Sequence, residues 1–81
     1  MAATSEEWAE KVKRYLKAEL KRADVGYEEL AQKLTDMGLE ESKASITMKL
    51  NRGTFPAWFF FAVLKAIGCQ TVRVDEVSSL A

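Results

Sequence analysis

YEELAQKLTDMGLEESKASITMKLNRG, from Tyr27 to Gly53, carries the pattern from which the fold of the whole chain is predicted. Apolar residues recur in it at helical spacing, first at Tyr27, Leu30, Ala31, Leu34 and Met37, and then at Ile46 and Leu50. Between the two sets lies Gly38, which suits the left-handed conformation that ends many helices. Gly53 closes the stretch in the same way. The pattern predicts one helix over 27–37 and another over 42–52.

Two helices joined at a glycine turn, the second carrying small polar and basic residues, have the layout of a helix-turn-helix unit. The second helix has a polar side at steps of three and four, formed by Ser42, Ser45, Lys49 and Arg52, and Lys43 flanks the core side. Short hydroxyls and long cations suit base edges and phosphates, so we expect these five residues to contact DNA. The alternative is a plain bundle of amphipathic helices, in which the polar stripe simply faces solvent.

The segment before this stretch predicts a helix over 5–23, with Ser5 as its N-cap. Its apolar stripe steps by four through Trp8, Val12, Leu16 and Leu20. Bases fill most of the remaining surface, where phosphate contacts are expected from Lys17, Lys21 and Arg22. The alternative for this basic side is a solvated face. Glu19 falls inside the apolar stripe and needs a partner, for which Arg52 or a lysine is expected.

The segment after Gly53 predicts a helix over 56–67, opened by Pro56 and stopped by Gly68. Its inner stripe consists of Phe60, Val63, Leu64 and Ile67, with Phe59 at the edge. Trp58 and Phe61 fall on the other side and must also be covered. Either the rest of the monomer covers them, or they form a homodimer contact, where large aromatic side chains are favoured. Base stacking is a weaker interpretation, because only Lys65 brings positive charge nearby.

The tail over 69–81 alternates Val72 and Val74 with polar residues, which is typical of a short strand. No other strand is predicted, so this one would pair with the same strand of a second copy. The alternative is an extended tail lying on the helices. In the first case Val72 and Val74 join Trp58 and Phe61 in a dimer interface.

The composition indicates one globular domain over 1–81, since 48% of the residues are hydrophobic and one is proline. Twelve Lys and Arg balance twelve Asp and Glu, whereas DNA-binding domains are often basic. The charges nevertheless segregate along the chain. Residues 11–22 carry six bases and one acid, and residues 24–41 carry six acids and one base.

The chain carries little that points to a membrane, an enzyme or a metal. No run approaches 18 apolar residues, and the start MAATSEEW lacks the pattern of a signal peptide. Cys69 is the single cysteine and there is no histidine, so neither a disulfide within the chain nor a metal-ligand spacing is available. No glycine-rich phosphate loop is present. We expect a cytoplasmic protein that is not an enzyme, without cofactor, metal or small-molecule substrate.

Three segments carry a resemblance to a known family: EELAQKL at 28–34, LNRG at 50–53 and LKAIGC at 64–69, with Gly38 between the first two. The chain resembles the lambda-repressor-like helix-turn-helix family of the Cro and Xre type. It looks still more like a group of small bacterial proteins that share EEW near the front and an NRGTF-like segment. The family resemblance implies an all-α fold, a dimer and binding to operator DNA.

The chain also departs from the family pattern. The stretch between Leu34 and Leu50 is about six residues longer than in a typical repressor. Tyr27 stands where members often have a Gln or Ser that contacts phosphate, and Asn51 stands where many have an acid. The DNA-facing positions of the second helix are therefore not carried over one by one.

Taken together, the sequence predicts an all-α, four- or five-helix repressor-like bundle with a short C-terminal strand or extended tail. The expected function is sequence-specific DNA binding by a homodimer, as a bacterial transcriptional regulator. The alternative is a protein–protein interaction module that has this fold and does not bind DNA. The neutral net charge and the spare aromatic side chains of Trp58 and Phe61 favour that alternative.

Overall fold

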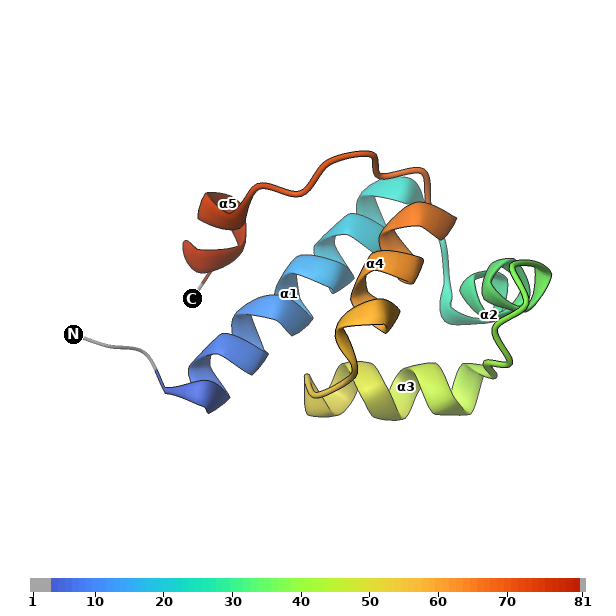
Figure 1. Cartoon of the computed structure of the whole chain (residues 1–81), viewed down its shortest axis with the longest axis horizontal. Coiled ribbons are helices and arrows are strands. Elements are labelled where there is room, and N and C mark those ends of the chain that lie inside the picture. The colour runs from blue at the N-terminus through green and yellow to red at the C-terminus, as the bar shows by residue number, and fades with distance from the viewer. Residues whose placement is uncertain (1–3, 81) are drawn as a thin grey trace.

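The computed structural model describes residues 4–80, which form five α-helices and no strand (Figure 1). The helices are α1 (Ser5–Ala23), α2 (Tyr27–Asp36), α3 (Lys43–Arg52), α4 (Ala57–Ala66) and α5 (Val74–Ser78). The predicted all-α class and its four- or five-helix bundle are therefore confirmed. None of the helices within residues 4–80 is long and apolar enough to cross a membrane.

The start of α1 differs from the prediction by one residue. Thr4, and not Ser5, is the N-cap, because its side-chain oxygen accepts a hydrogen bond from the Glu7 backbone N–H at 3.1 Å. Thr4 has an extended backbone, which leaves Ser5 as the first helical residue. Either hydroxyl could have capped the helix, and the sequence alone does not decide which of the two neighbouring residues is the N-cap.

Three helices end in the same hydrogen-bonded motif, in which a left-handed residue turns the chain. At the end of α2 this residue is Gly38, with a φ of 91°, and the following Leu39 N–H donates to the Leu34 carbonyl at 2.9 Å. Gly68 ends α4 in the same way. The end of α1 uses Asp24 instead, with a φ of 59°. Asp24 is the one non-glycine residue with a positive φ within residues 4–80.

Replacing Asp24 with glycine is expected to raise the free energy of unfolding by about 0.5–1 kcal/mol. The left-handed conformation costs L-residues about 1–2 kcal/mol, which glycine avoids at a smaller entropic cost. A carboxylate at a helix C-terminus also opposes the helix dipole. Thermal unfolding should show a rise of several degrees in Tm. Asp24→Asn is the matched control, since it removes only the charge; a Tm gain as large as that of Asp24→Gly would refute the backbone explanation.

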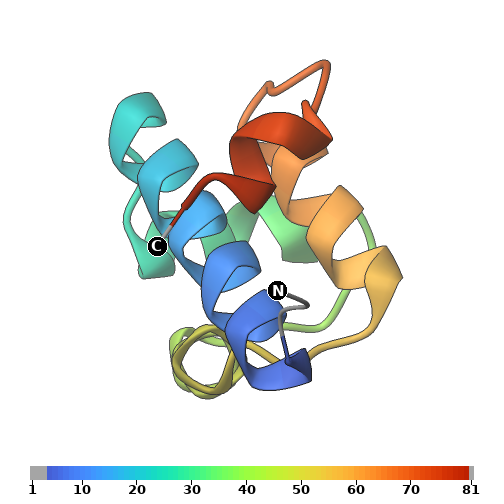
Figure 2. The same ribbon diagram turned by 90° about the vertical axis from the view of Figure 1, so that its left-hand side faces the viewer.

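The core lies where α4 meets α1 on one side and α2 on the other, with α3 crossing the base of both (Figures 1 and 2). It consists of Tyr15, Leu16, Leu20, Leu30, Leu34, Ile46, Leu50, Phe59, Val63, Leu64 and Val77. One detail of the prediction is wrong. Phe59 is fully buried and Phe60 is half-buried, the reverse of the expected order. The rotation of α4 about its axis is fixed by packing against α1 on one side and α2 on the other. The repeat of apolar residues along α4 does not determine this rotation.

The end of α3 rests directly on the backbone of α1. Gly53 is buried and has a φ of 69°, and a Cβ atom at this position would lie 2.7 Å from the Ala9 carbonyl oxygen. Only glycine allows both the left-handed turn and this close approach. Gly53 therefore sets the distance between α3 and α1.

The tail does not form the strand that the alternation of valines predicted. Residues 69–73 have no regular structure, and α5 follows them. A lone strand leaves its backbone groups unpaired, whereas the turn of α5 pairs several of its own and packs Val77 into the core. Lys11 fastens this end by donating from Nζ to the carbonyls of Ser78 and Leu80, both at 2.8 Å. Strand pairing between two copies is therefore excluded in this conformation.

Candidate nucleic-acid interface

The unit of α2 and α3 is joined by residues 37–42, a longer connection than the three or four residues usual in a helix-turn-helix. Ser42 caps α3, accepting from the Ser45 N–H at 3.1 Å, while the Ser45 hydroxyl accepts from the Ser42 N–H at 2.9 Å. This reciprocal pair is a capping box, with serine in place of the usual Glu or Gln. Both hydroxyls that were predicted to contact DNA thus serve the start of the helix.

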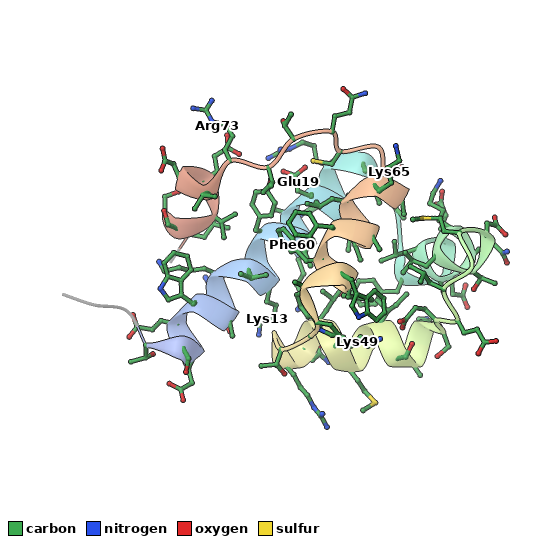
Figure 3. All side chains as sticks on the ribbon, in the orientation of Figure 1. Lys13, Glu19, Lys49, Phe60, Lys65 and Arg73 are labelled. Atoms are coloured by element: carbon green, nitrogen blue, oxygen red, sulfur yellow. The ribbon has the colours of Figure 1, made fainter. Side chains whose placement is uncertain are left out.

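Glu41 is buried beside this cap and accepts hydrogen bonds from two of the predicted DNA contacts. Its side chain is 4% exposed. One carboxylate oxygen lies 2.7 Å from the Ser45 hydroxyl, and the other lies 2.6 Å from Lys49 Nζ. The Lys49 ammonium also lies 4.7 Å from the ring centre of Phe59 and 5.6 Å from that of Trp58. Figure 3 shows Lys49 on the side of α3 that faces α4.

The structure places Ser45 and Lys49, two of the predicted DNA contacts, half-buried against the protein itself. Lys43 and Arg52 are exposed, and neither forms an ion pair within residues 4–80. A helical wheel could not reveal this difference, because Glu41 lies outside α3 and folds back over it.

The outer face of α3 has three exposed residues along its middle, which helical spacing brings together: Ala44, Met48 and Asn51. Lys43 and Arg52 flank this centre on opposite edges and at opposite ends of the helix. Sequence reasoning missed Asn51 as a candidate, although it lies on the face opposite Ile46 and Leu50. That opposition was the signal that could have found it.

On α1 a basic row begins at the C-terminal end of α3. Lys13, Lys17 and Lys21 recur every four residues, and Lys13 Nζ donates to the Asn51 carbonyl at 3.4 Å. Lys17 and Lys21 are exposed and form no ion pair within the part of the chain that the structure describes. Lys13 therefore joins the basic row to the end of α3, and Lys17 and Lys21 lie about one and two helical turns further along α1.

Arg22, the third predicted phosphate contact on α1, faces a different direction. Its guanidinium donates to the buried Glu19 carboxylate at 2.7 Å. This pairing also corrects the expectation that Arg52 or a lysine would neutralise Glu19. A partner three residues along the same helix is within reach, and Arg22 fills that role.

Glu10 reduces the positive charge of the basic row. It forms ion pairs with Lys13 at 3.0 Å and with Arg14 at 3.3 Å. The hydrogen bond from Lys13, followed by that from Arg14, holds the pKa of the Glu10 carboxyl below its ordinary value. Glu6 and Glu10 also line a hollow with Arg52. On α1 and α3, the exposed cations that form no ion pair within residues 4–80 are Lys17, Lys21, Lys43 and Arg52.

A separate apolar surface lies on α4, where Trp58 is 51% exposed and Phe61 is 58% exposed. Within residues 4–80, neither the other helices nor the tail covers these two side chains fully. Beside Phe61, a hollow of about 440 Å³ between α1 and α4 is lined by Val12, Phe55, Ala57 and Phe60. Of the predicted dimer residues on the tail, Val74 is 69% exposed and Val72 is half-buried.

Within residues 4–80, no three Cys, Asp or Glu side chains converge in a way that could hold a metal ion. Compared with known protein families, residues 8–72 match the model of a family described as "Domain of unknown function (DUF6471)". The match runs from the first turn of α1 through α4 and stops before α5. No curated protein and no solved structure matches the chain.

Proposed function

The chain belongs to the DUF6471 family, and we propose that it is a DNA-binding protein, acting as a transcriptional regulator through the exposed face of α3. One observation carries the proposal. The outer surface of α3 has no acidic residue, and its two free cations, Lys43 and Arg52, stand at opposite ends of a face that the rest of the protein leaves open.

The dimensions of α3 suit a major groove. Ten residues span about 15 Å along a helix axis, and the major groove of DNA is about 12 Å wide. Lys43 and Arg52 would contact phosphates on either side of the groove. The centre of the face would meet the base edges, where the Asn51 amide matches adenine and the Ala44 methyl matches the thymine methyl.

The position of Glu41 also supports the proposal. Two acids just before α3 would repel a phosphate backbone if both faced solvent. The Glu41 carboxylate instead points inward to Ser45 and Lys49, and Glu40 alone is exposed there. The basic row of α1, which meets the end of α3 at Lys13, adds the exposed cations Lys17 and Lys21 further along α1.

A salt titration tests the proposal. Four phosphate contacts predict a slope of about −3.6 in a plot of log K against log salt concentration, and each lost contact reduces its magnitude by about 0.9. The double variant Lys43→Met with Arg52→Met should therefore lose about half of the slope. Lys65→Met is the matched control, because Lys65 lies at the far end of α4 from α3 (Figure 3). Undetectable binding, or equal slopes for the double variant and the control, would contradict DNA recognition by α3.

A second candidate function, interaction with a protein, rests on Trp58 and Phe61. The partner that fits best is a second copy of this chain. In a symmetric dimer each residue lies near its own counterpart, so an interface rich in charges of one sign would repel itself. Lys65 is the single charged residue of α4, so α4 carries little charge that would oppose such a contact.

Sedimentation equilibrium distinguishes the two candidates. Self-association that Trp58→Ala abolishes supports the α4 contact, and Met48→Ala is the matched control, since Met48 is 55% exposed on α3. A monomer at all concentrations would rule out this dimer. A dimer without any DNA binding would leave the interaction module as the remaining function.

A further inference from the structure

We propose that Glu41 is an autoinhibitory latch, which holds Lys49 away from the DNA-facing side of α3 until the ion pair opens. This inference rests on the proposed DNA binding. It goes further, because it assigns a regulatory role to a buried contact and predicts a tighter-binding variant.

The contact between Glu41 and Lys49 is more enclosed than the other ion pairs of residues 4–80. The side chains are 4% and 29% exposed, and the two atoms lie 2.6 Å apart. The other four pairs each include a side chain that is at least 39% exposed. The Lys49 ammonium also lies near the ring faces of Trp58 and Phe59. Lys49 is therefore the one cation of α3 that the fold withdraws from solvent.

Room for the released side chain is present next to the pair. A hollow of about 290 Å³ runs along α3 and is lined by Ser45, Met48, Lys49, Arg52 and the Phe55–Pro56 segment. The four-carbon stem of a lysine rotates about several bonds, so the ammonium can move from Glu41 into this hollow. There it would lie beside Arg52, one helical turn along the same face.

While it lies 2.6 Å from Glu41 and beside the rings of Trp58 and Phe59, the Lys49 ammonium is on the side of α3 that faces α4, away from a phosphate on the exposed face. Neutralising Glu41 therefore leaves Lys49 free for phosphate. One additional phosphate contact should make the salt slope steeper by about 0.9. Linkage requires the reverse effect as well, so that bound DNA favours the open pair.

Four variants test the latch in the same salt titration. Glu41→Gln keeps the side-chain shape and a hydrogen bond, and should steepen the slope by about 0.9. Glu40→Gln is the matched control, because it removes an exposed charge from the neighbouring residue and frees no cation. Lys49→Met should leave the wild-type slope unchanged, and Glu41→Gln with Lys49→Met should lose the gain. Equal effects of Glu41→Gln and Glu40→Gln, or a slope that Lys49→Met already reduces, would overturn the latch.

A second measurement needs neither DNA nor a substitution. Acetic anhydride acetylates free lysine ammonium groups after they lose a proton, and mass spectrometry gives the rate at each site. Lys49 of the wild-type protein should react several-fold more slowly than Lys43, which is exposed on the same helix. Equal rates would show that the pair is open in solution and would overturn the latch. Slow Lys49 acetylation without any DNA binding would instead refute the proposed function and leave the contact purely structural.

Discussion

Replacing Gly53 with alanine is expected to lower the free energy of unfolding by about 2–4 kcal/mol. The added Cβ would lie 2.7 Å from the Ala9 carbonyl oxygen, a distance that only a shift of backbone can relieve. The residue also has a φ of 69°, which alanine adopts at a cost. Chemical denaturation of the two proteins measures the difference.

Gly68→Ala separates the two causes. Gly68 has a similar φ of 81°, but no atom lies within 4 Å of its would-be Cβ. This control should therefore lose only about 1 kcal/mol, the cost of the conformation alone. If Gly53→Ala lowers the free energy of unfolding by no more than Gly68→Ala does, α3 does not approach α1 as closely as described.

Replacing Lys49 with methionine is expected to lower the free energy of unfolding by about 2–3 kcal/mol. Methionine has a side chain of similar length, but it removes the ammonium from the rings of Trp58 and Phe59 and leaves the Glu41 carboxylate without its counter-charge. Breaking a buried pair on one side costs about 3–5 kcal/mol, and the partial exposure of Lys49 reduces this figure. Thermal or chemical unfolding measures the loss.

Two further variants isolate the charge effect. Lys43→Met changes an exposed lysine at the start of the same helix and should alter stability by less than about 0.5 kcal/mol. Adding Glu41→Gln to Lys49→Met removes the unpaired charge and should restore part of the stability. A double variant less stable than Lys49→Met alone would show that the carboxylate does not cause the loss.

The elements of this fold that were predictable from sequence are those set by local chemistry. Gly38 and Gly68 ended helices because their backbone freedom fits the left-handed position, whatever the rest of the chain does. Asp24 takes the same role at the end of α1. Aspartate has no strong preference for the position, so the tertiary fold decides the choice.

The candidate site was harder to predict, because ion pairs within the protein decide which of its cations stay free. Helical spacing alone does not show those pairs. Lys49 and Arg52 both lie on the polar side of α3, yet one is paired with a carboxylate from the preceding loop and the other is free. Arg22 likewise shares α1 with Lys17 and Lys21 but turns to Glu19. A helical wheel gives the direction in which a side chain leaves the helix. It does not give the position of the charged group at the end of a long side chain.

The tail shows how tertiary packing overrides local preference. Val72 and Val74 favour a strand by residue type, but no partner strand lies within residues 4–80. A short helix that buries Val77, with Lys11 bonded to its last carbonyls, satisfies more backbone groups. The structure therefore moves the expected dimer contact away from the tail and leaves Trp58 and Phe61 as its basis.

Selection from a random DNA library with purified protein at physiological salt tests the DNA-binding role of α3 most directly. We expect the wild-type protein to enrich a defined sequence motif, with adenine opposite Asn51. A protein carrying Lys43→Met, Asn51→Ala and Arg52→Met should enrich none. If the wild-type protein recovers the same unselected sequences as this triple variant, α3 does not read DNA.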